Sequence, residues 1–99
     1  MSMTTFKKWD LAEHIQNVDD AVFYIQDALQ TGNLEMILST LDCVSRSVGM
    51  KNLSEKMGVN LNSLYRSFNK ETDPKFSTIL KLFNALGLVL NIQKAETSM

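Results

Sequence analysis

The sequence predicts an all-α fold: a compact bundle of about five short helices in one domain, residues 1–99, with a short C-terminal β-strand. The chain has 99 residues, of which 44% are hydrophobic, enough for one small core. Apolar residues recur at intervals of three and four along most of its length, which is typical of amphipathic helices. The four glycines follow these stretches, at positions where helices end: Gly32, Gly49, Gly58 and Gly87.

The first third of the chain, residues 1–32, is expected to be an acidic helical segment. A short helix is predicted at residues 11–15, capped by Asp10. The apolar stripe from Ala21 to Leu29 then predicts a longer helix that ends at Gly32, with Asp19 and Asp20 available as N-cap and first-turn acids.

Residues 33–87 are expected to form the core of the domain, which contains the helix-turn-helix described below. Asn33 is placed to cap a helix whose apolar stripe runs from Leu34 to Val48. The stripe from Phe76 to Leu86, after the only proline and before Gly87, predicts the last helix.

Residues 88–93 predict a strand, because apolar side chains alternate there and the segment is too short to extend the helix. A lone strand needs a hydrogen-bonding partner. Two partners are open: residues near Phe6 of the same chain, or the same strand of a second copy.

Between Met50 and Asn69 lie two helical patterns that are too short to stand alone. They are separated by Gly58-Val59-Asn60, a spacing typical of a helix-turn-helix. Gly58 can adopt the positive φ of a sharp turn, and Asn60 is a good N-cap. Each helix carries one i, i+4 apolar pair: Leu53 with Met57, and Leu64 with Phe68.

The formal net charge of −1 hides an asymmetry between the two halves of the chain. Residues 1–43 carry two basic and seven acidic side chains, and residues 44–99 carry eight basic and four acidic ones. The C-terminal half therefore suits a polyanion, and the N-terminal half suits another partner. A chance division of scattered surface charge explains the same count.

The remaining side chains of the second short helix suit base reading, since Asn can bond adenine and Arg guanine in the major groove. These residues are Asn62, Ser63, Tyr65, Arg66 and Asn69. Lysines on both sides are placed to meet phosphates: Lys51, Lys56, Lys70 and Lys75. An ordinary helix corner with a solvated polar face is the alternative, and the local basicity favours DNA.

The chain contains a series of short motifs, none of which is unique alone. Their order and spacing together are specific enough to indicate a family. The motifs are FKKWDLAEHI, Asp20-Ala21, Tyr24-Ile25, Ala28-Leu29, Arg46, Gly49-Met50, Leu53, Gly58, Leu64-Tyr65-Arg66, Pro74-Lys75-Phe76 and Leu86-Gly87-Leu88. In these residues the chain resembles the addiction-module antidote proteins, small HigA-like antitoxins related to phage repressors. The resemblance covers nearly everything from Phe6 to Ile92.

The resemblance implies a cytoplasmic repressor, usually dimeric, in which residues 33–87 form a helix-turn-helix core of the phage-repressor type that binds a double-stranded DNA operator. It also implies a cognate toxin of the RelE/ParE-like group, encoded beside it. The matching positions imply a DNA-facing set of Asn60, Asn62, Ser63, Tyr65 and Arg66. The chain departs from the family at Ser54, which replaces the usual alanine, and at Leu61, where relatives place a polar or basic residue. Leu61 therefore either touches a thymine methyl group or packs.

The N-terminal segment holds a candidate toxin-binding surface formed by Phe6, Trp9, Asp10 and Glu13. Tryptophan is enriched at binding hot spots, and an acidic face would complement a basic RNA-cleaving toxin. The alternative is that the aromatic residues cover the bundle while the acids form a solvated face.

An enzyme is not expected, because no nucleophile, acid pair, metal cluster or phosphate loop can be assembled from these residues. Cys43 is the only cysteine and His14 the only histidine, which excludes an intrachain disulfide and a structural zinc site. No cofactor or metal is expected. The longest apolar stretch is too short to span a bilayer and no export signal precedes it, so we expect a cytoplasmic protein.

The sequence therefore predicts a DNA-binding antitoxin of a type II toxin-antitoxin module that represses its own operon and neutralises its toxin. A homodimer would place two 61–69 helices in successive major grooves of a palindromic operator. Two alternatives stay open: a protein-interaction module or inhibitor that never touches DNA, which the low net charge favours slightly, and a stand-alone prophage repressor.

Overall fold

The computed structural model describes residues 15–69, 71 and 73–95. These residues form an all-helical bundle, as predicted. The helices are α2 (Val18–Thr31), α3 (Leu34–Val48), α4 (Met50–Met57), α5 (Leu61–Ser67) and α6 (Phe76–Leu86). The short helix expected over residues 11–15 lies almost wholly outside the described part of the chain.

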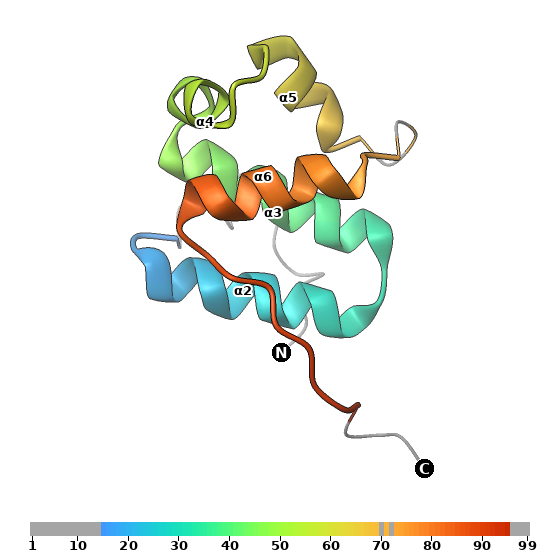
Figure 1. The fold of residues 1–99 in the computed structure, drawn as a ribbon. Helices are drawn as coiled ribbons and strands as arrows, with labels where there is room; N and C mark the ends of the chain where they lie inside the picture. The colour runs from blue at the N-terminus through green and yellow to red at the C-terminus, as the bar shows by residue number, and fades with distance from the viewer. Residues whose placement is uncertain (1–14, 70, 72, 96–99) are drawn as a thin grey trace.

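Helices α2 and α3 form an antiparallel pair, joined by a sharp connection at Gly32 and Asn33 (Figure 1). Asn33 caps α3 as predicted, because its side chain accepts a hydrogen bond from the Met36 amide at 3.0 Å. The prediction of an aspartate cap for α2 is wrong. Asn17 has the extended backbone that a cap needs and accepts from the Asp20 amide at 2.9 Å, while Asp19 and Asp20 occupy the first turn.

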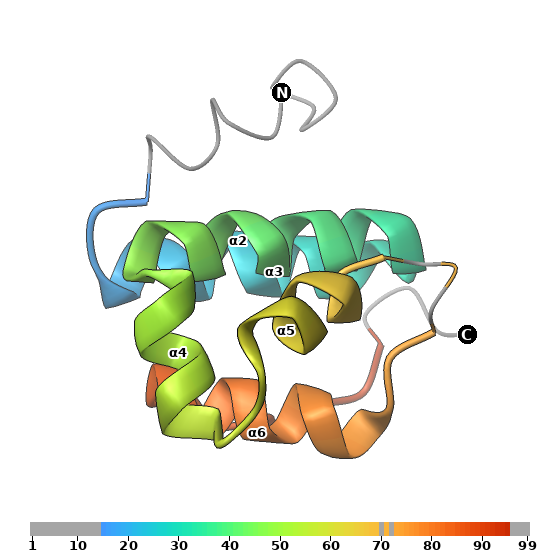
Figure 2. The ribbon, with the colours of Figure 1, turned by 90° about the horizontal axis from the view of Figure 1, so that it is seen from above.

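The remaining helices pack on one side of this pair. Figure 1 shows α4 and α5 at one end of the molecule and α2 at the other, with α6 crossing between them; Figure 2 gives the view from above. Helix α4 packs against α3, α5 and α6, and so holds these three helices together.

Each of the helices α2 to α6 contributes to one hydrophobic core, because each carries an apolar stripe on its inner face. Leu41, Leu53, Leu64 and Leu82 are all almost completely buried. Leu53 of α4 and Leu64 of α5 belong to the same cluster, so the two short helices are fixed by the core that the longer helices form.

The predicted strand over residues 88–93 is not found. Helix α6 ends at Gly87, and the chain continues without forming a strand through residue 95. Leu88 packs against the core, whereas Val89 and Ile92 are 91% and 95% exposed. A strand needs a neighbour with which to exchange backbone hydrogen bonds. No such neighbour exists among the described residues, and the partner suggested near Phe6 lies outside them.

Candidate nucleic-acid interface

Helices α4 and α5 meet at a tight corner built by three residues. Gly58 adopts φ 71°, in the left-handed region, and its amide donates to the Glu55 carbonyl at 3.3 Å. The Val59 amide donates to the Ser54 carbonyl at 3.0 Å, which completes a Schellman motif. Val59 is half-buried and packs against the core. The positive φ predicted for Gly58 is therefore confirmed.

Asn60 starts α5, as predicted. Its side-chain oxygen accepts a hydrogen bond from the Asn62 amide at 2.7 Å, and its carbonyl accepts from the Leu64 amide at 3.0 Å. The cap therefore uses the side-chain oxygen of Asn60 as its acceptor. The side-chain nitrogen of Asn60 is a hydrogen-bond donor that the cap does not use.

One side of α5 is exposed and mostly polar. Leu61, Asn62, Tyr65 and Arg66 lie on it, and their positions cover an arc of about 140° around the helix at 100° per residue. Asn69 is exposed just beyond the end of α5 at Ser67. Leu64 fills the opposite side and is buried, and Ser63 is half-buried beside it. Of the five predicted base-reading residues, Asn62, Tyr65 and Arg66 therefore share this edge, whereas Asn69 follows the helix. Ser63 lies about 60° outside the arc.

The two lysines of α4 do not lie on the same side. Lys51 lines a hollow together with Leu61 and Tyr65 of α5, whereas Lys56 lines another with Lys81 of α6. On the helix the two positions are about 140° apart. Lys51 thus borders the exposed edge of α5, and Lys56 belongs to the α4–α6 surface.

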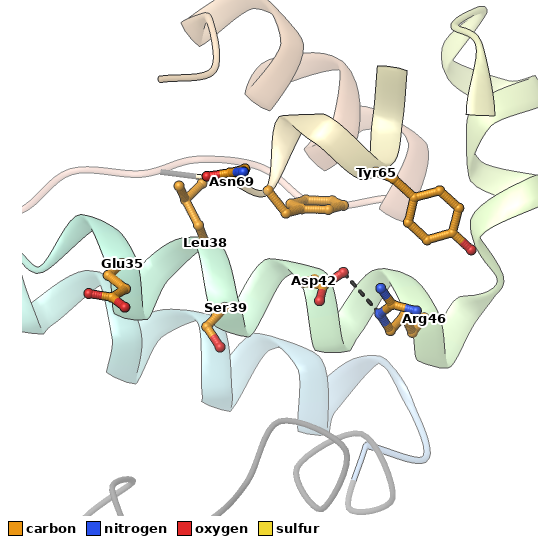
Figure 3. Close-up of a pocket in the computed structure, with 8 residues that line it drawn as sticks. Glu35, Leu38, Ser39, Asp42, Arg46, Tyr65 and Asn69 are labelled. Atoms are coloured by element: carbon orange, nitrogen blue, oxygen red, sulfur yellow. Dashed lines mark hydrogen bonds and ion pairs between the residues drawn. The ribbon is translucent and has the colours of Figure 1, made fainter. Parts of the chain in front are cut away.

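Arg46 of α3 also borders the exposed edge of α5. The sequence did not indicate this residue as a DNA-binding candidate. Its guanidinium carbon lies 5.2 Å from the centre of the Tyr65 ring, and its Nε donates to Oδ1 of Asp42 at 3.1 Å (Figure 3). The Asp42 side chain is only 4% exposed, so the ion pair is anchored in the bundle. The i, i+4 spacing of Asp42 and Arg46 is the signal in the sequence that could have pointed to it.

Tyr65 stands between two hollows of the surface. One is about 450 Å³ and lies between α3 and α5, lined by Leu38, Asp42, Arg46, Phe68 and Asn69 among others (Figure 3). The other lies where α3 ends, between α4 and the start of α5, and also includes Arg46. The arginine therefore reaches the rim of both hollows and supports the ring that separates them.

Lys75, the fourth lysine predicted to meet phosphates, is the N-cap residue of α6. The other predicted site residues lie outside the described part of the chain, namely Lys70 and the toxin-binding candidates Phe6, Trp9, Asp10 and Glu13. Among the described residues, no group of three or more His, Cys, Asp or Glu side chains could hold a metal ion. Within the same residues, no helix is long and apolar enough to cross a membrane.

The fold and this corner define a small all-helical domain that presents a polar, basic helix edge. The chain belongs to the family described as probable addiction module antidote proteins, whose model matches residues 5–94. It is 30% identical over 90 residues to an uncharacterized protein of Haemophilus influenzae, an alignment covering 91% of this chain and 93% of that protein. No solved structure matches the chain. Membership of an antidote family indicates an antitoxin and implies a toxin partner.

Proposed function

We propose that this antitoxin binds operator DNA through α4 and α5, which act as a helix-turn-helix, represses its own operon, and neutralises a RelE/ParE-like toxin without catalysing a reaction. The observation that carries the proposal is the exposed edge of α5, held on a capped corner that the core fixes in place. Membership of the antidote family supports the antitoxin part.

The edge of α5 has the chemistry for reading bases. The major groove is about 12 Å wide and admits a helix. Asn62 and Arg66 are four residues apart on the exposed side, so both face the same way. An amide pairs well with adenine and a guanidinium with guanine. These two side chains are therefore the proposed sequence readers.

The charged residues around the corner between α4 and α5 favour the binding of a polyanion. Between Arg46 and Asn69 the chain has four basic residues and one acidic residue, Glu55. Arg46 and Lys51 border the edge on one side, where they can neutralise phosphates while α5 enters the groove. Phosphate contacts of this kind position the helix, and base contacts give it specificity.

The operator is proposed to be palindromic and bound by a homodimer in the cytoplasm, with one α5 from each copy in successive major grooves. Such a complex would cover the promoter of the module and reduce its own synthesis. The toxin would be bound elsewhere on the protein, so that both partners can be engaged.

A gel shift combined with co-expression tests the proposal. The full chain is expressed with the product of the gene beside its own and then mixed with the DNA upstream of that gene pair or with a scrambled duplex. We expect the upstream DNA to be retarded at salt concentrations at which the scrambled duplex is free, and the two proteins to purify together.

Each part of the proposal can fail separately. A protein complex that retards neither duplex would overturn the DNA-binding part and leave an interaction module. Specific retardation without any complex would overturn the toxin-neutralising part and leave a stand-alone repressor.

A further inference from the structure

Helix α2 presents a large aromatic side chain to solvent. It buries Ala21, Ile25 and Ala28 against the bundle, yet Phe23, which lies on the opposite side, is 62% exposed. The neighbouring outward positions are polar, as expected for the solvent side of an amphipathic helix. The phenyl ring is therefore an apolar centre in a polar helix face.

The ring of Phe23 is held in place by Tyr24. The two ring centroids are 5.1 Å apart with the planes at 78°, an edge-to-face contact. Tyr24 is itself half-buried and packs against the core. Phe23 thus extends the core outward as a supported aromatic surface, which loses less conformational freedom on binding than an unsupported side chain.

Carboxylates flank this aromatic centre along the helix. Asp19 and Asp27 lie four residues before and after Phe23, so the three form one stripe on the exposed face of α2. Both aspartates are exposed, and within the described residues neither has an ion-pair partner. From Trp9 to Ser45 the chain contains seven acidic residues and no lysine or arginine. The stretch of chain that carries Phe23 is therefore acidic, which favours a basic partner.

This face lies away from the proposed DNA-binding edge. Figure 1 shows α2 at the opposite end of the bundle from α4 and α5, and α3 and α6 lie between them. A protein bound on the outer side of α2 would leave α5 accessible.

We infer that the toxin docks on the outer face of α2, with Phe23 as the anchor and Asp19 and Asp27 as the charged rim. The partner surface that fits is a basic one with an apolar pocket for a phenyl ring. Aromatic anchors dominate binding at protein interfaces, and opposite charges around them speed association. The inference rests on the toxin-neutralising part of the proposed function and names its surface.

The test is a calorimetric titration of the full chain with the purified product of the neighbouring gene. Phe23→Ala is compared with Phe76→Ala, which removes an aromatic ring of similar exposure, 66%, from α6. Asp27→Lys is compared with Glu71→Lys, a reversal at an exposed acid outside α2. Melting curves check that each variant folds, as expected for exposed positions.

We expect Phe23→Ala to raise the Kd for the neighbouring protein by about 30-fold or more, the loss typical of a binding hot spot. Asp27→Lys should weaken the complex and reduce its salt dependence. Phe76→Ala and Glu71→Lys should leave the Kd within about threefold of the wild-type value. All four variants should still bind operator DNA.

Equal affinities for wild type and Phe23→Ala would overturn the inference while leaving the proposed function intact. A wild-type chain that does not bind the neighbouring protein at all would overturn both the inference and the toxin-neutralising part of the function. In that case operator binding would show whether the repressor part survives.

Discussion

Arg46 joins a buried carboxylate to the exposed edge of α5. Its guanidinium makes an ion pair with Asp42 and stacks on Tyr65, so one side chain links α3 to the proposed recognition helix. The Asp42–Arg46 pair could be predicted from the i, i+4 spacing. The contact with Tyr65 could not, because it depends on how α5 crosses α3.

A double-mutant cycle measures this link. We expect Arg46→Gln and Tyr65→Leu to show a coupling free energy of about 0.5–1 kcal/mol in urea unfolding, the range for an exposed cation–π pair. Additive losses would show that the stacking in the structure contributes nothing to stability. The same variants should both weaken DNA binding, because the arginine supports the tyrosine on the edge.

Arg66 and Lys56 are predicted to differ in what they contribute to DNA binding. Arg66→Ala should cost about 1–3 kcal/mol on the operator and relax the base preference. Lys56→Ala should weaken all DNA about equally and flatten the salt dependence. Its position beside Lys81, away from the edge of α5, makes its effect the smaller one. Titrations against operator and scrambled duplex at several salt concentrations separate the two.

The same titration tests whether Arg66 contacts bases or phosphates. An Arg66→Ala variant that loses the same factor for both duplexes would assign that residue to the phosphates.

Among the secondary-structure elements, the corner between α4 and α5 could be predicted from the sequence, because the residues that form it act on backbone groups close to them in the chain. Gly58, Val59 and Asn60 act on backbone groups within five residues of themselves, and the roles predicted for Gly58 and Asn60 are confirmed. The predicted C-terminal strand required instead a second strand with which to exchange backbone hydrogen bonds. The alternation of apolar residues does not show whether such a strand is present. The cap of α2 was missed by two residues, since Asn17 and Asp19 are both residue types that cap helices.

Gly58→Ala tests the strain that the corner imposes. An added Cβ would meet no atom within 4 Å, so any loss comes from the backbone at φ +71°. We expect a loss of about 1–2 kcal/mol in the free energy of unfolding, the usual penalty for a left-handed residue with a side chain. Gly58→Asn should lose less, because Asn tolerates this region better. Equal stability of all three proteins would contradict the role given to the glycine.

At the scale of the molecule, the core makes the two short helices one body with the longer ones. The sequence predicts Leu53 and Leu64 as members of the i, i+4 apolar pairs with Met57 and Phe68, and both leucines are almost completely buried. Their contact with α2, α3 and α6 through the same cluster could not be predicted from spacing. The position of α5 therefore depends on residues far from it in sequence.

Removing a buried leucine should affect the whole domain. We expect Leu53→Ala to lower the free energy of unfolding by about 2–5 kcal/mol. Leu80→Ala, at a side chain that is 39% exposed, should have a clearly smaller effect. Chemical denaturation gives both values. Similar losses for the two variants would contradict the core described here.

The charge asymmetry of the sequence corresponds to two ends of the bundle. Acidic α2 lies at one end and the basic corner of α4 and α5 at the other (Figure 1). The division of charge was visible in the sequence, but the arrangement of the two regions on opposite sides required the fold. The proposed DNA-binding edge and the inferred toxin-docking face therefore lie at opposite ends of the domain.

The most direct test of the central claim is an NMR titration of the ¹⁵N-labelled chain with a duplex from upstream of its own gene. We predict that the largest shift changes fall on the edge of α5, above all at Asn62 and Arg66, and on Lys51, while the outer face of α2 stays unchanged. Changes centred on α2 or α6, with α5 unaffected, would contradict the claim that this corner binds DNA.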